Sequence, residues 1–242
     1  MKTLLIGLVA SLCLWAVPIE AAITFGAATS NGSASATSIA CTLTGVTSGD
    51  LIVVATSNNN GGNPVISLAD DQGSAYTLDE SYSDVGLLGR VYSAVAGATA
   101  THIITFTQTN AFRIGCIATR FSGSFNAARL NAHTKTSDAG PGTAVSSGNI
   151  TTTCNDALLF GATVGGSAET ATLGTGYSNF TAATNGRLGA ESKIVAGTVT
   201  DDADFTLGMS DTWGAVVAAY RESGATCAGP PIGSLQLLGV GR

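Results

Sequence analysis

The chain has few charged residues and no excess of positive ones. Only 11% of its 242 residues are Asp, Glu, Lys or Arg, against about 25% in an average soluble domain. Ten basic residues stand against sixteen acidic ones, which gives a net charge of −6. Nucleic acid is therefore not an expected partner, because binding a phosphate backbone needs a basic surface. Helical bundles are not expected either, since too few Glu, Lys and Arg are available to cover their helices.

Sequence motifs of catalysis are also missing. The chain has no Gly-x-Ser-x-Gly turn, and any general base for a nucleophile would have to be His102 or His133. His102 begins an apolar strand segment and is expected at the surface or at a strand end, and His133 is expected in solvent. Glu80 and Glu191 are the candidate carboxylate pair of a hydrolase, but acidic side chains on strands are usually solvated. The sequence therefore predicts a protein that is not an enzyme.

Residues 1–22 have the pattern of a secretory signal peptide. Lys2 precedes an apolar run at 3–17, and Ala21 and Ala22 offer a cleavage site of small residues. The apolar run is shorter than the roughly 20 residues that a membrane-spanning helix needs. We therefore expect cleavage, export of the mature chain, and no membrane contact afterwards.

Four cysteines remain after the predicted cleavage. An even number of cysteines in an exported chain favours two disulfides, with three possible pairings. Zinc is less favoured, because the chain has no Cys-x-x-Cys motif and both histidines lie far from any cysteine in sequence. No cofactor is expected. The disulfide candidates are Cys41, Cys116, Cys154 and Cys227.

Four segments of the first half recur in the same order in the second half, at an offset of roughly 100 residues. One such match would be chance in a chain so rich in Ala, Gly and Thr, but four in register favour an internal duplication. The matched segments are 48–56 with 154–163, 89–97 with 189–197, 103–107 with 204–207, and 112–121 with 212–220.

Each half has the pattern of a β-domain. Short runs rich in Val, Ile, Thr, Tyr and Phe alternate with clusters of Gly, Asn, Asp and Ser. The runs at 51–55 and 215–220 are apolar without alternation, so both faces of these strands must be covered. The sequence predicts an all-β, two-sheet, jelly-roll-like β-sandwich built from an internal duplication. One integral sandwich is favoured over two tandem ones.

These observations divide the chain into five parts. The joining segment lacks the proline and the charge of a free linker. The predicted parts are the signal peptide (1–22), the first β repeat (23–121), the joining segment (122–147), the second β repeat (148–222) and a C-terminal tail (223–242).

The pattern resembles a known kind of module. Gly49-Asp50 opens an apolar strand, and Asp70-Asp-Gln-Gly-Ser-Ala-Tyr76 follows it. This arrangement resembles jelly-roll-like β-sandwich modules of secreted bacterial surface proteins and phage appendages. The resemblance covers most of the mature chain, but it rests on turns and core strands. It therefore implies a fold and a setting, and no catalytic residue.

Two kinds of ligand site have candidate residues in the sequence. Carboxylates on a turn can begin a calcium shell, although Asp more often caps turns. Trp213 has no aromatic counterpart in the first repeat, so it is a candidate for an exposed platform that binds carbohydrate. The weak calcium candidates are Asp70, Asp71, Asp201, Asp202 and Asp204.

The scarcity of charge also suggests how copies of the chain interact. Exposed faces made of Thr, Ser, Asn, Ala and Gly are poorly defended against pairing with another chain. The segments 23–27 and 229–242 could pack on their own sheet or add a strand to a neighbour. We therefore expect a non-enzymatic, exported structural or attachment subunit of a cell surface, an extracellular filament or a virion appendage, with other copies of itself as partners. The alternative is a carbohydrate-binding module that recognises surface glycans through Trp213.

Overall fold

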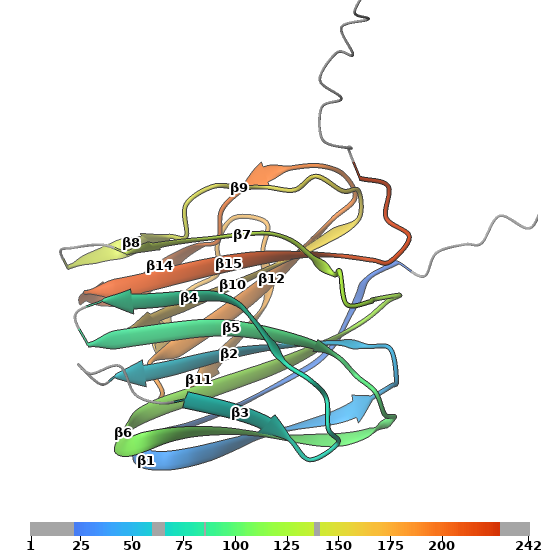
Figure 1. The fold of residues 1–242 in the computed structure, drawn as a ribbon. Helices are drawn as coiled ribbons and strands as arrows, with labels where there is room; N and C mark the ends of the chain where they lie inside the picture. Colours follow the sequence, from blue (N-terminus) through green and yellow to red (C-terminus); the bar gives the residue numbers. More distant parts are fainter. Residues whose placement is uncertain (1–21, 60–65, 85, 138–140, 228–242) are drawn as a thin grey trace, which may run out of the picture.

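The computed structural model describes residues 22–59, 66–84, 86–137 and 141–227. Apart from Ala22, the predicted signal peptide lies outside the described residues, as do residues 228–242 of the predicted tail. The described chain consists almost entirely of antiparallel strands (Figure 1), which confirms the prediction of an all-β sandwich. In that part of the chain, no helix has the length and apolarity needed to cross a membrane.

The first half forms a six-stranded sheet. Its strand order is β1-β6-β2-β5-β4, and β3 pairs with one end of β6. All of these pairs are antiparallel. The strands are β1 (Thr24–Val46), β2 (Leu51–Asn59), β3 (Ile66–Asp70), β4 (Thr77–Asp84), β5 (Leu87–Val95) and β6 (Ala100–Ser122).

The second half forms a five-stranded sheet with two small strand pairs above it. The large sheet has the order β11-β12-β10-β15-β7, and the small pairs are β8 with β14 and β9 with β13. The elements are β7 (Leu130–Ser137), β8 (Gly142–Ser146), β9 (Ile150–Thr151), β10 (Ala157–Gly165), the 3₁₀-helix η1 (Ala168–Thr170), β11 (Ser178–Ala183), β12 (Leu188–Val195), β13 (Thr200–Asp201), β14 (Asp204–Asp211) and β15 (Trp213–Arg221).

The two large sheets pack face to face and share one core. Leu51 and Val53 of the first sheet lie in this core with Phe160 and Tyr220 of the second. Each fully buried aliphatic or aromatic side chain of this size contributes about 1.5–3 kcal/mol. The two halves are therefore one integral body, as the doubly apolar strands indicated.

Each large sheet has a second core on its outer face. In β2, the alternate residues Ile52 and Val54 point away from the shared core and into the first of these. The outer cover comes from the far ends of β1 and β6, which reach it because the β1–β6 register shifts between Ser33 and Ser38. In the second half, β8 and β14 cover the outer face in the same way. Four layers therefore explain why central strands are apolar on both faces.

Both predicted disulfides form. Cys41 bonds to Cys116, and Cys154 bonds to Cys227. The first bridge joins the outer end of β1 to the sheet portion of β6, so it crosses the small core of the first half. The second joins the segment before β10 to the chain after β15. The structure thus selects one of the three pairings that the sequence left open.

The two large sheets share one strand order. Starting at β1 and at β7, respectively, the orders β1-β6-β2-β5-β4 and β7-β15-β10-β12-β11 correspond strand for strand. Phe121 and Tyr220, which the repeat aligns, both lie in the shared core. This correspondence agrees with an internal duplication, which stays a prediction together with the jelly-roll description. The predicted joining segment 122–147 contains β7, which pairs along β15, and β8, which pairs with β14; the predicted domain bounds stay a prediction.

Candidate functional site

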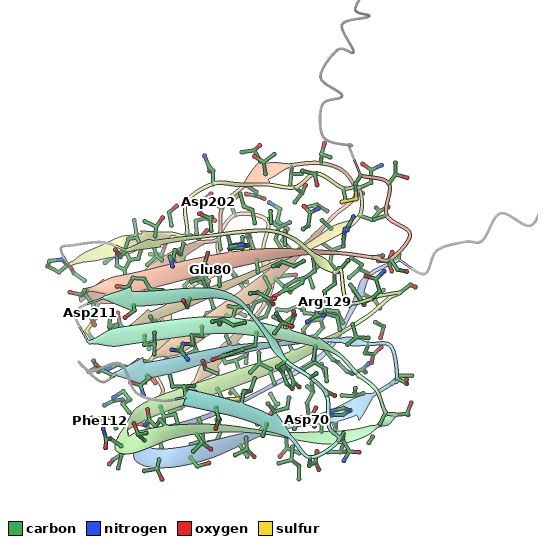
Figure 2. The ribbon with its side chains drawn as sticks, viewed as in Figure 1. Asp70, Glu80, Phe112, Arg129, Asp202 and Asp211 are labelled. Carbon is green, nitrogen blue, oxygen red and sulfur yellow. A yellow bond between two sulfur atoms is a disulfide. The ribbon has the colours of Figure 1, made fainter. Side chains whose placement is uncertain are left out.

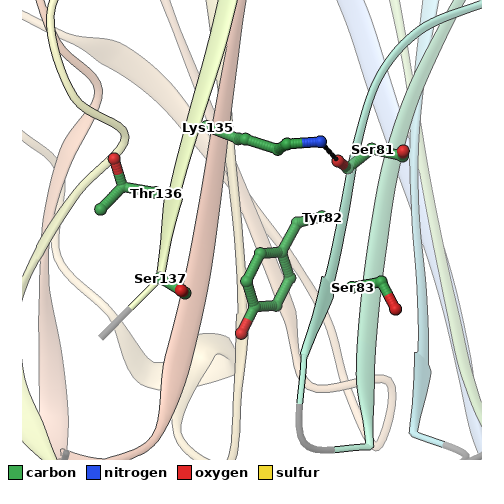
Figure 3. A pocket seen from close by; sticks show the side chains of 6 residues that line it. All are labelled: Ser81, Tyr82, Ser83, Lys135, Thr136 and Ser137. Atoms are coloured by element: carbon green, nitrogen blue, oxygen red, sulfur yellow. Dashed lines mark hydrogen bonds between the residues drawn. The ribbon is translucent and has the colours of Figure 1, made fainter. Parts of the chain in front are cut away.

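A polar groove lies between two sheet edges. β4 ends the first large sheet, β7 ends the second, and the two strands are neighbours. The groove between them has a volume of about 370 Å³ (Figure 3). An edge strand leaves backbone N–H and C=O groups unpaired on one side, so backbone donors and acceptors border this groove. Its lining residues are Ser81, Tyr82 and Ser83 from β4, and Lys135, Thr136 and Ser137 from β7.

An ionic clasp joins the two edges at one point. Glu80 Oε2 lies 2.7 Å from His133 Nδ1, and Glu80 Oε1 lies 3.2 Å from Lys135 Nζ. The same Nζ donates a 2.6 Å hydrogen bond to the carbonyl oxygen of Ser81. Burial opposes ionisation of Glu80, but hydrogen bonds from His133, the Ser81 amide and Lys135 outweigh it and lower its pKa. The clasp thus holds a charged carboxylate between β4 and β7.

Tyr82 fills the base of the groove. Its side chain is buried, and its hydroxyl donates a 3.4 Å hydrogen bond to the Trp213 carbonyl oxygen of β15. A Cβ at Gly214 would collide with the Tyr82 ring. Glycine at this position therefore allows the ring to lie directly against the backbone of β15. The groove therefore presents hydroxyl groups and backbone, with no exposed aromatic face.

Trp213 does not form a binding platform. It begins β15, but only 5% of its surface is exposed, and it packs in the outer core of the second half. Its indole Nε1 has no hydrogen-bond partner in the described structure. The prediction of an outward-facing Trp213 is therefore wrong, because the small strand pairs cover this face of the sheet. The glycan alternative loses the residue on which it rested.

The first pair of calcium candidates is occupied by protein donors. Asp70 Oδ2 lies 2.8 Å from His102 Nδ1, and the Tyr76 hydroxyl donates to the same oxygen at 3.3 Å. Asp71 accepts a 2.8 Å hydrogen bond from the Ile103 amide. Burial on its own would raise the pKa of Asp70. Hydrogen bonds from His102, the Gln72 amide and others outweigh burial, so the pKa of Asp70 lies below its usual value. These contacts hold the turn after β3.

His102 is not a surface residue. Its side chain is fully buried, and its two ring nitrogens lie against Asp70 and the carbonyl oxygen of Ala98. The expectation of a surface position is therefore wrong, although His102 does lie near the beginning of β6. In hydrolases a His–Asp pair of this kind orients the imidazole that takes the proton from a nucleophile. In this chain both ring nitrogens are occupied by the Asp70 carboxylate and the Ala98 carbonyl oxygen, so neither is left for a nucleophile. His133, by contrast, is exposed, and it belongs to the clasp.

The second group of calcium candidates is also engaged. Asp201 pairs with Lys193 at 2.5 Å, Asp202 accepts a 2.5 Å hydrogen bond from Ser146, and Asp204 accepts one from a backbone amide. Figure 2 shows Asp70 and Asp202 in the outer layers of different halves. Within the described ranges, no three His, Cys, Asp or Glu side chains are grouped to hold a metal ion. These carboxylates are therefore engaged by protein donors, and calcium binding by them stays a prediction.

Glu191 is the most perturbed carboxyl group of the described chain. It lies in β12 with 1% of its surface exposed, and its Oε2 accepts a 2.8 Å hydrogen bond from the Gly174 amide. Its Oε1 has no partner in the described structure. Burial, reinforced by the charges of Asp204, Asp201 and Asp202, raises its pKa to about 8. Sequence reasoning expected a solvated carboxylate at this position.

The structure does not bring Glu80 and Glu191 together as a hydrolytic pair. Glu80 lies at β4, beside β7, whereas β12 is three strands from β7 in the second sheet, or about 14 Å at the usual strand spacing. Ala190 points into the shared core, so Glu191 faces the opposite, outer side of the sheet. A glycosidase needs its two carboxyl groups within about 10 Å across one cleft.

Sequence reasoning missed the groove residues. The pattern that could have found them is in β7, where exposed His133, Lys135 and Ser137 alternate with half-buried Thr134 and Thr136. Such alternation is typical of an edge strand with one solvated face. It does not reveal that the edge of the other sheet, β4, lies next to β7.

Comparison of the chain with protein-family models, with curated proteins and with solved structures found no match. The resemblance to secreted and phage modules therefore stays an expectation from the sequence.

Proposed function

We propose that the protein is a non-enzymatic structural or attachment subunit, exported from the cell, whose copies associate by strand addition at the groove between β4 and β7. The observation that supports this proposal most is the pair of neighbouring sheet edges. Within the described chain, β4 pairs only with β5, and β7 pairs only with β15. An edge strand of a second copy would find hydrogen-bonding partners on either side of the groove.

The chemistry of the groove suits such pairing. Hydroxyl side chains such as Ser83 and Ser137 are small, neutral and exposed. At these positions a strand of a second copy would meet neither a charged group nor a large side chain. Lys135 is the one basic residue in the lining, and the clasp commits its ammonium group to Glu80 and the Ser81 carbonyl. The opening of the groove near Ser83 and Ser137 is therefore the accessible part of both edges.

The end segments of the chain contribute differently. Residues 23–27 pack on their own sheet, because Ile23 is buried in the shared core and Phe25 pairs with Phe121 of β6. Residues 229–242 lie outside the described residues. We therefore assign strand addition to the β4–β7 groove rather than to the N-terminal segment. Export is supported by the two disulfides, which persist in oxidising compartments.

Sedimentation velocity over a range of protein concentrations tests this proposal. The mature chain is expected to form species larger than the monomer as its concentration rises. Ser83→Lys and Ser137→Lys each place a charge at the open end of the groove and are expected to shift the protein to monomer, because lysine on an edge strand opposes pairing. Ile103→Lys is the matched control, since it adds the same charge on an exposed face of β6, between β1 and β3.

Two results would contradict the proposal. A monomer at every concentration would remove self-association as the function. Association that persists in both groove variants but disappears in Ile103→Lys would move the interface to the outer layer of the first half. In either case thermal unfolding of the variants must show that they fold.

A further inference from the structure

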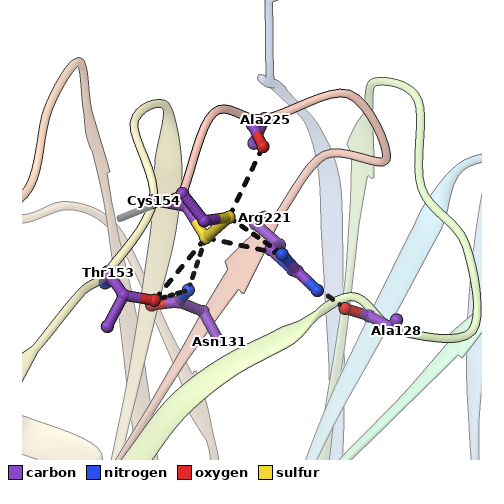
Figure 4. Close-up of a disulfide and its surroundings, with 7 residues drawn as sticks. Ala128, Asn131, Thr153, Cys154, Arg221 and Ala225 are labelled. Atoms are coloured by element: carbon purple, nitrogen blue, oxygen red, sulfur yellow. Dashed lines mark hydrogen bonds between the residues drawn. A yellow bond between two sulfur atoms is a disulfide. The ribbon is translucent and has the colours of Figure 1, made fainter. Parts of the chain in front are cut away.

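The two disulfides lie in different chemical surroundings. Cys41 and Cys116 are 1% and 0% exposed, and they lie in the apolar outer core of the first half. The bond between Cys154 and Cys227 lies at the end of the described chain among polar side chains (Figure 4). The two bridges should therefore respond differently to a reducing agent.

Hydrogen-bond donors surround the second bridge. Arg221 Nη1 lies 2.8 Å from Cys227 Sγ and 3.6 Å from Cys154 Sγ. The side-chain amide of Asn131 donates to Cys154 Sγ at 2.8 Å, and the Thr153 hydroxyl lies 3.7 Å from the same sulfur. These groups stabilise negative charge on sulfur, and a cation or donor beside a cysteine lowers the pKa of its thiol.

The Arg221 guanidinium is held in place by the backbone around it. Its Nε donates a 3.1 Å hydrogen bond to the Ala128 carbonyl oxygen, and its own amide donates to the Arg129 carbonyl oxygen at 2.8 Å. Figure 4 shows the guanidinium between Ala128 and the two sulfur atoms. The cation is thus fixed beside the bridge before any reductant arrives.

Access to the two sulfur atoms is unequal. Cys154 is fully buried, whereas Cys227 is partly exposed. An incoming thiolate therefore reaches Cys227 Sγ first, and Cys154 Sγ becomes the leaving group. A leaving thiol with a lowered pKa departs faster in thiol–disulfide exchange. Asn131, 2.8 Å from Cys154 Sγ, stabilises that leaving thiolate. Arg221 lies nearer to Cys227 Sγ, at 2.8 Å, than to Cys154 Sγ, at 3.6 Å, so it stabilises negative charge on either sulfur.

We propose that Cys154–Cys227 is a thiol–disulfide exchange site for a dithiol reductant, activated by Arg221 and Asn131, and that Cys41–Cys116 is a closed structural bridge. A thiolate of the dithiol attacks Cys227 Sγ, the Sγ–Sγ bond breaks, and its electron pair goes to Cys154 Sγ. The second thiol of the reductant then displaces Cys227 as a thiolate and leaves as an intramolecular disulfide. The dithiol loses two electrons and two protons, and the two cysteines gain them.

Opening the bridge removes the covalent link between Cys227 and the segment before β10. Besides the disulfide, one backbone hydrogen bond holds residues 226–227 to the segment before β10. In it the Asn155 amide donates to the Thr226 carbonyl oxygen at 3.0 Å. One hydrogen bond adds only about 1 kcal/mol to stability. Glu222 and Ser223 keep their own hydrogen bonds to Ser124, so exchange at this site controls how firmly residues 226–227 are held to the sandwich.

Timed reduction of the folded protein with dithiothreitol, followed by alkylation and mass spectrometry of the cysteine peptides, tests the proposal. Cys154–Cys227 is expected to open at least about tenfold faster than Cys41–Cys116. Arg221→Gln should slow the opening of Cys154–Cys227 by at least about threefold, and Arg221→Lys should restore most of the rate because it keeps the positive charge. Arg113→Gln is the matched control, since Arg113 bonds to the Asn185 carbonyl oxygen and to neither disulfide.

The rate of Cys41–Cys116 serves as an internal measure of folding, because a destabilised variant opens both bridges faster. Equal rates for the two bridges in the wild-type protein would overturn the proposal, since they would indicate reduction through global unfolding. A wild-type rate in Arg221→Gln, or equal slowing in Arg113→Gln, would also overturn the role assigned to the Arg221 guanidinium.

Discussion

Replacing Glu191 with Gln should make the protein more stable at neutral and alkaline pH. The carboxyl group of Glu191 is buried with one oxygen unpaired, and its pKa is raised to about 8 from a usual value of 4.5. Between these two pH values the folded state keeps the proton and the unfolded chain releases it. Stability contributed by the protonated group is therefore complete below pH 4.5 and is lost as the pH rises towards 8.

The size of this effect follows from the pKa difference. One pKa unit corresponds to about 1.4 kcal/mol, so ionisable Glu191 costs about 3 kcal/mol of unfolding free energy at pH 7 and about 5 kcal/mol above pH 8, relative to acidic pH. Gln keeps the carbonyl oxygen that accepts the Gly174 amide and carries no charge. The variant should therefore lack this part of the pH dependence.

Urea unfolding followed by circular dichroism, at intervals between pH 4.5 and 8.5, measures this difference. The free energy of unfolding of the wild-type protein should fall relative to that of Glu191→Gln as the pH rises. A difference between the two proteins that does not change with pH would refute the reasoning. It would mean that Glu191 ionises in the folded state as easily as in the unfolded chain.

Three further predictions concern single side chains. Glu80→Gln should destabilise the protein at neutral pH and have little effect well below pH 4, because the lowered pKa of Glu80 contributes stability only while the carboxylate is ionised; urea unfolding at pH 3 and pH 7 checks this. Gly186→Ala should cost about 1–3 kcal/mol in thermal or urea unfolding, since the new Cβ would lie 2.7 Å from Gly115 Cα, whereas the control Gly97→Ala, with no atom within 4 Å, should be nearly neutral. Tyr220→Phe should lower the free energy of unfolding by about 1.5–3 kcal/mol, because it removes a buried 2.7 Å hydrogen bond to a carboxylate of β4; an unchanged urea midpoint would show that this bond contributes nothing.

The strands and their layering could be predicted because they depend on patterns many residues long. The unbroken apolar run at 51–55 required cover on both faces, and the structure supplies it from the second sheet on one side and from the ends of β1 and β6 on the other. The even number of cysteines likewise predicted two disulfides. These inferences depended only on how many apolar residues each segment has and how they are spaced. They did not require knowing which segment of the chain covers which strand.

Single functional positions could not be predicted, because each depends on a distant segment of the chain. Trp213 was expected outside, but β8 and β14 cover it. His102 was expected at the surface or at a strand end, and it is buried near a strand end because its partner Asp70, 32 residues earlier in the chain, lies against it. The groove exists only because the edges of two sheets from different halves become neighbours. The residue type shows that a side chain is polar, but it does not show which distant segment will pack next to that side chain.

The shared core between the large sheets has a consequence for biosynthesis. When the ribosome has completed the first half, the inner face of its sheet, with Leu51 and Val53, has nothing to pack against. Part of its cover comes from β15, the last strand of the described chain, through Val216, Ala218 and Tyr220. A nascent chain that stops early would expose a continuous apolar sheet and aggregate.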